Sequence, residues 1–95
     1  MRVFQASIHQ GKEQEFSKFF HETAIPLIKQ MPGLISVSAG APRSESPTEF
    51  SMVTIWRDLD ALREFTGEDY ANPTVHPDEA ELVRVRSVKH YQLVD

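Results

Sequence analysis

The chain has 95 residues, 40% of them hydrophobic and 25% charged, and a formal net charge of −4. This length and composition are typical of a single globular domain, spanning residues 1–95, and so small a domain gains stability from extra burial in an oligomer. An acidic balance offers no general attraction to phosphate, so it argues against nucleic acid or an anionic membrane as a partner. The sequence shows neither a long apolar run nor a signal-peptide pattern, and it has no cysteine. We therefore expect no membrane span, no disulfide and a cytoplasmic protein.

Residues 2–9 are rich in β-forming side chains and predict a first strand. Residues 12–31 then carry apolar side chains at offsets that repeat on one face of a helix. Pro26 lies inside this stripe and cannot donate a hydrogen bond to the carbonyl of Glu22, so we expect the helix to kink or restart there. The Pro-Gly pair at 32–33 ends it.

Residues 34–41 predict a second strand, and the segment 42–47, rich in serine, proline and charge, predicts a hairpin loop into a third strand at 49–56. The third strand is mostly apolar on both of its faces. One face carries Phe50, Met52, Thr54 and Trp56, and the other carries Ser51, Val53 and Ile55. The two predicted helices can cover only one face of a sheet, so we expect the second face to meet another copy of the chain.

Asp58 is the predicted cap of a second helix, which carries Leu59, Leu62 and Phe65 and ends at Gly67. An irregular segment, a short helix starting at 77 and a last strand over 83–94 follow. The order strand, helix, strand, strand, helix, strand predicts an α+β fold of the ferredoxin-like βαββαβ type, with a four-stranded antiparallel sheet and helices on one face. Two such sheets packed face to face would form a dimeric α+β barrel.

Six short motifs follow one another along nearly the whole chain. They are GKEQEF at 11–16, IPLI at 25–28, MPGL at 31–34, TIWRD at 54–58, ALREF at 61–65 and VKHY at 88–91. In order and spacing they resemble the antibiotic biosynthesis monooxygenase (ABM) domain family of the dimeric α+β barrel superfamily. The resemblance implies a homodimer with a small-molecule site.

Several activities occur among proteins that resemble this chain. The expectation we adopt is a cofactor-independent monooxygenase, or a related small-molecule isomerase, acting on a small aromatic, polyketide-like substrate without cofactor or metal. The alternative is a non-catalytic small-molecule-binding or structural homodimer.

Haem degradation is the less favoured function. The haem-degrading members use an asparagine on the first strand, a tryptophan on the second helix and a histidine in the segment that follows. Here the first strand offers Gln5, Ala6 and Ser7, and Phe65 stands at the tryptophan position. Only His76 lies near its expected place, so one position in three matches.

His76 and Tyr70, in the irregular segment, are the candidate catalytic residues. An imidazole can bind a ligand or move a proton near neutral pH, and a tyrosine hydroxyl can donate to a ligand carbonyl or phenolate. The alternative roles are structural: His76 would cap the short helix at the surface, and Tyr70 would anchor its own loop.

Phe16, Phe20, Trp56 and Phe65 are expected to wall a mostly apolar cavity between the helices and the sheet, with Tyr70 and His76 at its rim. Core packing is the alternative role for Trp56, a large aromatic side chain with a single donor.

The last strand adds basic side chains to the predicted pocket. Arg84, Arg86 and His90 share one face by alternation, and they would suit an anionic or enolate-like ligand if that face lines the interior. A solvated strand edge with salt bridges is the alternative. No metal site is expected, because the zinc-protease pattern that His21 begins has Ile25 where the second histidine should stand.

Overall fold

A computed structural model describes residues 1–71 and 79–94. The elements in chain order are β1 (Arg2–Ile8), α1 (Glu13–Phe19), the π-helical turn η1 (Phe20–Ala24), α2 (Ile25–Lys29), β2 (Leu34–Gly40), β3 (Glu49–Trp56), α3 (Leu59–Thr66) and β4 (Val83–His90). All strand pairs are antiparallel, and the sheet order is β2-β3-β1-β4. The ferredoxin-like α+β fold predicted from the sequence is thereby confirmed.

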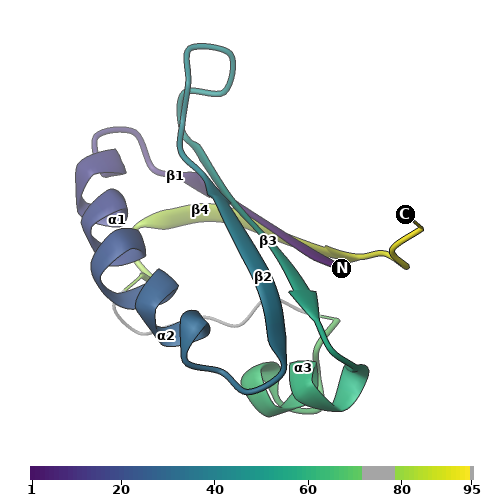
Figure 1. The fold of residues 1–95 in the computed structure, drawn as a ribbon. Coiled ribbons are helices and arrows are strands. Elements are labelled where there is room, and N and C mark those ends of the chain that lie inside the picture. Colours follow the sequence, from purple (N-terminus) through teal and green to yellow (C-terminus); the bar gives the residue numbers. More distant parts are fainter. Residues whose placement is uncertain (72–78, 95) are drawn as a thin grey trace.

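The helices are arranged along one side of the sheet and at one of its ends. In Figure 1, α1 and α2 run beside the strands, and α3 lies where β3 ends. The last strand is shorter than predicted, since β4 ends at His90 and residues 91–94 continue without strand structure. Of the short helix predicted from 77, the described residues 79–81 form a turn.

Phenylalanine side chains fill the core between α1, η1 and the sheet. Phe16 and Phe20 are 1% and 2% exposed, and both rings pack on Phe50 of β3, with centroid distances of 4.7 and 5.4 Å. Ala6 and Ile8 of β1 are buried in the same cluster. Each such buried side chain contributes about 1.5–3 kcal/mol of hydrophobic stabilisation. The helical stripe therefore makes the core.

The interruption expected at Pro26 takes the form of a π-helical turn. Because Pro26 has no N–H, the α-helical hydrogen bond back to Glu22 cannot form. The wider turn, Phe20–Ala24, comes immediately before it, and the N–H of Ile25 bonds to the carbonyl of Phe20, five residues earlier. The chain thus continues as a helix through the proline.

Local signals fix the position of α3. The side chain of Asp58 accepts a hydrogen bond of 2.8 Å from the N–H of Ala61, and this bond lowers the pKa of the carboxyl group. Gly67 ends the helix with φ at +82°. Gly33, just before β2, also has a positive φ of +83°, and a Cβ there would collide with that of Ala61 in α3. Both predicted boundaries of α3 are confirmed, and Gly33 allows its close approach to the start of β2.

The sheet surface opposite the helices is called the open face here. It carries Val3, Ser51, Val53 and Ile55, all half-buried, and Val3 lies directly across from Val53 in the register of β1 and β3. Phe50, Met52, Thr54 and Trp56 point to the helix side, as their alternation predicts. A register shift near the start of β2 leaves Ile35 64% exposed.

Candidate functional site

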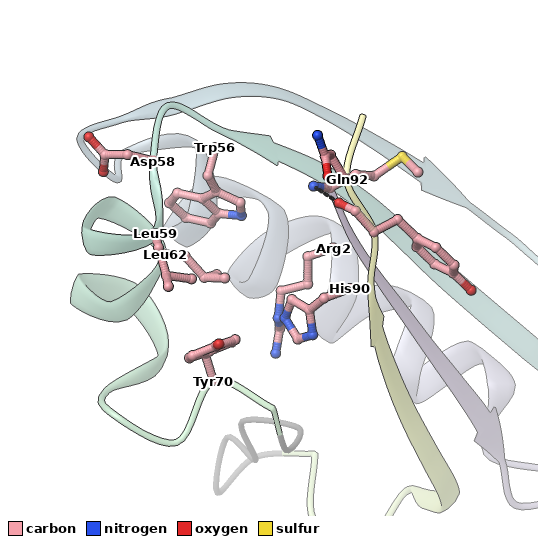
Figure 2. A pocket seen from close by; sticks show the side chains of 10 residues that line it. Arg2, Trp56, Asp58, Leu59, Leu62, Tyr70, His90 and Gln92 are labelled. Carbon is pink, nitrogen blue, oxygen red and sulfur yellow. Dashed lines mark hydrogen bonds between the residues drawn. The ribbon is translucent and has the colours of Figure 1, made fainter. Parts of the chain in front are cut away.

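A pocket of about 830 Å³ lies between α3 and the neighbouring ends of β1, β3 and β4. Its volume is in the range of small-molecule sites, about 300–1,000 Å³. Figure 2 shows Trp56 and Leu62 on one side of it, Arg2 and His90 on the other, and Tyr70 beyond α3 pointing toward them. The pocket therefore has one apolar wall and one basic wall.

The apolar wall is fixed by packing and by one hydrogen bond. The indole of Trp56 stacks on the ring of Phe65, with centroids 5.6 Å apart and an interplanar angle of 23°. Its Nε1–H donates to Oγ1 of Thr54 at 2.9 Å, which satisfies the only polar group of the indole. Leu62 of α3, only 4% exposed, also lines this side of the pocket.

The basic wall arises from the register of two strands. Arg2 of β1 pairs directly with His90 of β4, so both side chains project from the same face as immediate neighbours. Arg2 is only 5% exposed, and burial lowers the pKa of its guanidinium. That group lies 6.0 Å from the centroid of the Phe65 ring. Among the described residues, nothing accepts a hydrogen bond from its Nε or Nη2.

His90 links Arg2 to the segment after α3. The edge of its ring meets Tyr70, with centroids 5.2 Å apart and an angle of 87° between the rings. Burial, and then the positive charge of Arg2 and of the amino group at Met1, lower the pKa of His90 below 6.5. Its Nε2 is buried without a hydrogen-bond partner in the described part of the chain. A neutral imidazole with an unpaired nitrogen can accept a proton at neutral pH.

Three of the residues predicted for the site, Trp56, Tyr70 and His90, meet in this pocket. Phe65 lies behind Trp56 and supports it. Phe16 and Phe20 do not line it, because their rings are held against Phe50 in the core. His76 lies outside the described residues.

The basic residues of β4 separate. The register between β1 and β4 shifts at Ile8, which pairs with Val83, so Arg84 falls at the irregularity and is exposed. Arg86 is half-buried and lies 3.8 Å from the carboxylate of Glu79. Arg86 and His90 share a sheet face, as their alternation predicts. A β-bulge, for which the sequence carries no signal, moves Arg84 off that face.

Arg2 was missed by the sequence analysis. The available signal was a charged residue in phase with Ala6 and Ile8, on the side of β1 that faces the helices. A charge in phase with an apolar stripe is a candidate binding residue, since a buried charge is costly unless something pairs with it.

No helix among the described residues is both long enough and apolar enough to cross a membrane. Within residues 1–71 and 79–94, no group of three or more His, Cys, Asp and Glu side chains is placed to hold a metal ion.

Comparison with solved structures finds the same fold in several proteins. Protein SO0527 from Shewanella oneidensis is 21% identical, with a TM-score of 0.77 over 95% of this chain and 85% of that one. PA3566 from Pseudomonas aeruginosa is 15% identical, with a TM-score of 0.74 over 98% and 92% of the two chains. SnoaB, a cofactor-independent oxygenase from Streptomyces nogalater, is 18% identical, with a TM-score of 0.68 over 98% and 92%.

At sequence level, no curated protein matches the chain. The model of the family described as antibiotic biosynthesis monooxygenase matches residues 1–77. That match spans β1 through α3, which include most of the pocket's apolar wall and Arg2. The chain therefore belongs to the antibiotic biosynthesis monooxygenase family.

Proposed function

We propose that the chain is a cofactor-independent monooxygenase that oxidises a small aromatic, polyketide-like substrate in the pocket between α3 and the sheet. Family membership and the likeness to SnoaB, which is named as a cofactor-independent oxygenase, support this proposal. The observation that carries it is local: His90, whose Nε2 has no hydrogen-bond partner among the described residues, lies across the pocket from the apolar wall of Trp56 and Leu62. A phenolic substrate stacked on that wall would meet a proton acceptor.

The reaction requires the substrate to supply the electrons. A phenol or enol that loses its proton becomes electron-rich enough to pass an electron to O2, and the two radicals then join in a carbon–oxygen bond. The resulting peroxide takes up a proton, and the hydroperoxide then loses the hydrogen on the same carbon together with its outer hydroxyl group as water, which leaves a carbonyl. One oxygen atom of O2 thus enters the product, and the other leaves as water.

In this scheme His90 takes the proton, and the hydroxyl of Tyr70 donates a hydrogen bond to the developing oxyanion. Positioning on Trp56 holds the reacting carbon near the same groups. His76 is the other candidate base, and its place at the rim of the pocket stays a prediction. The same groups could serve a related isomerase, since proton transfer is the first step of both.

Oxygen uptake measured with a panel of hydroxyanthrones and quinols tests this proposal. The wild-type protein should consume oxygen above the buffer rate with at least one compound. His90→Gln should lower kcat by roughly 10²-fold or more, the usual contribution of a general base. His9→Gln alters an exposed histidine that does not line the pocket and should leave kcat unchanged. An absence of uptake across the panel, or a His90→Gln variant as active as wild type, would overturn the proposal.

The alternative is a non-catalytic small-molecule-binding or structural homodimer. Tight binding of the same compounds without oxygen uptake would favour it. Haem degradation stays the less favoured function on the sequence grounds given above.

We also propose that the chain forms a homodimer through the open face. Val3, Val53 and Ile55 place contiguous apolar surface there, and a surface of this kind in a small domain favours association. Location in the cytoplasm stays a prediction from composition.

A further inference from the structure

Arg2 is an unusual residue for the edge of a small core. Its side chain is 5% exposed, and its Nε and Nη2 find no acceptor among the described residues. An arginine does not lose its proton in a protein, so the charge stays where it is. A buried cation with unpaired donors destabilises the folded chain unless a partner arrives.

The protein supplies Arg2 with aromatic contacts in place of a carboxylate. The guanidinium lies near the face of Phe65, which is itself stacked on Trp56. His90 stands beside it, and Arg63 lies 5.6 Å from the centroid of the Tyr70 ring. Two basic side chains, Arg2 and His90, therefore lie at one end of the pocket, while Arg63 stands behind Tyr70 and pairs with Asp60 at 3.6 Å.

Among the described residues that line the pocket, Asp58 is the one carboxylate, and it does not pair with Arg2. Asp58 accepts the hydrogen bond from Ala61 and lies 3.3 Å from the guanidinium of Arg57. In Figure 2 its carboxylate points away from Arg2, on the far side of Trp56. Counting the described lining residues, the end of the pocket near Arg2 and His90 is therefore positive, in a chain of net charge −4.

We propose that the pocket selects its ligand by a planar oxyanion, a carboxylate or a phenolate, which binds the guanidinium of Arg2 while the ligand's ring lies on Trp56. This inference rests on the proposed function, because it assigns a substrate class to the same pocket. The planar fork of arginine donates two parallel hydrogen bonds to such a group. When the ligand is a phenol, the phenolate left after proton transfer would hold the proton on His90, because a neighbouring anion favours the protonated imidazole.

Binding of compounds that cannot be oxygenated tests the inference apart from catalysis. The probes are 2-naphthoate, its neutral counterpart of similar shape 2-naphthamide, and 2,4-dinitrophenolate, measured by titration calorimetry. Wild type should bind 2-naphthoate at least tenfold more tightly than 2-naphthamide, the usual worth of a hydrogen bond to a charged group. The relative affinity of the dinitrophenolate shows whether the site prefers a phenolate or a carboxylate.

Two substitutions at Arg2 and one elsewhere separate local from general charge effects. Arg2→Gln and Arg2→Met should weaken 2-naphthoate binding at least tenfold and leave 2-naphthamide binding within about twofold. Arg43→Gln removes the same charge from the exposed hairpin and should leave both affinities unchanged.

A measurement on the wild-type protein makes the test independent of how the variants fold. Saturating 2-naphthoate should raise the pKa of His90, followed by NMR of its ring nitrogens, because it offsets the repulsion from Arg2 and from the amino group of Met1. Saturating 2-naphthamide should not. Among the described residues, Tyr70 is the titratable side chain whose ring contacts His90.

Three results would overturn the inference: equal affinity for 2-naphthoate and 2-naphthamide, unchanged 2-naphthoate binding in folded Arg2 variants, or no binding of either anion at millimolar concentration. Anion binding that depends on Arg2 without any oxygen uptake would support the inference and count against the oxygenase. Oxygen uptake that is unchanged in the Arg2 variants would support the oxygenase and count against the inference.

Discussion

At the scale of single residues, the pocket contains buried polar side chains that folding stability alone does not explain. Within residues 1–71 and 79–94, Arg2 is a buried cation whose Nε and Nη2 have no acceptor, and the buried Nε2 of His90 has no hydrogen-bond partner. Both lie on the sheet face that otherwise makes the core: Arg2 belongs to β1, and His90 is its direct partner on β4. Buried polar groups left unsatisfied in this way are typical of functional sites, where stability is given up for binding.

Replacing Arg2 with methionine should therefore stabilise the folded chain. Methionine keeps the apolar contact with Phe65 and removes the unpaired charge, so we expect the free energy of unfolding to rise by about 1 kcal/mol. Urea denaturation would measure this as a higher midpoint at an unchanged slope. Arg43→Met, on the exposed hairpin, should change stability by less than about 0.5 kcal/mol. A clear loss of stability in Arg2→Met would mean that the guanidinium has a structural partner.

The lowered pKa of His90 predicts a pH dependence of stability. The folded protein holds a proton on His90 less tightly than the unfolded chain, whose histidine has the ordinary value of 6.5. Stability should therefore be complete above about pH 6.5 and decline as the pH falls from there toward the folded pKa. Thermal unfolding between pH 5 and 7.5 would measure this, and His90→Asn should show a shallower decline. An equally steep decline in His90→Asn would assign the effect to another group.

At the scale of secondary structure elements, sequence patterns predicted what short-range chemistry determines. The cap at Asp58, the end of α3 at Gly67 and the facing of β3 residues each follow from a local rule. It was harder to predict what the apolar stripe of the first helix packs against. Periodicity shows that Phe16 and Phe20 are buried, but it does not show whether a cavity or Phe50 lies opposite them.

The candidate site was predicted only in part for a related reason. Trp56, Tyr70 and His90 could be suggested as pocket residues from their types and positions. Arg2 enters the site through its register with His90, and Arg84 leaves it through a bulge, and pairing register depends on contacts between distant segments. A single sequence does not directly record the pairing register of the strands or the position of the bulge.

The contact between the start of β2 and α3 yields a prediction at this scale. Gly33→Ala imposes a strained positive φ and also pushes a methyl group into Ala61, so we expect a loss of at least about 2 kcal/mol in the free energy of unfolding. Gly11→Ala shares the positive φ, +89°, but its Cβ would meet nothing within 4 Å. It should cost only the conformational part, about 1 kcal/mol. Equal losses in the two variants would show that α3 can move away from Gly33.

At the scale of the whole molecule, the open face is the surface through which we propose that two copies associate. The described helices all lie on one side, and the other side presents Val3, Val53 and Ile55. A second copy packed there would bury this surface and stiffen the sheet from which Arg2 and His90 project.

Val53→Asp should convert the proposed dimer into a monomer. The charge would stand in the middle of the open face, away from the Phe16 and Phe50 core, so the fold should survive. Homodimer interfaces of about 2,000 Å² or more persist at micromolar protein, and sedimentation would show wild type as a dimer and the variant as a monomer. Gln14→Asp, an exposed change on α1, should leave the dimer intact. A wild-type monomer at micromolar concentration would refute face-to-face assembly.

Oxygen labelling tests the proposed chemistry most directly. The purified protein would be given 18O2 and an active hydroxyanthrone or quinol in buffer without added cofactor, and the product analysed by mass spectrometry. A cofactor-independent monooxygenase should place one 18O atom in the product and the other in water, and His90→Gln should lose the labelled product. Product oxygen that comes from water, or labelled product formed at the same rate by His90→Gln, would contradict the proposed chemistry.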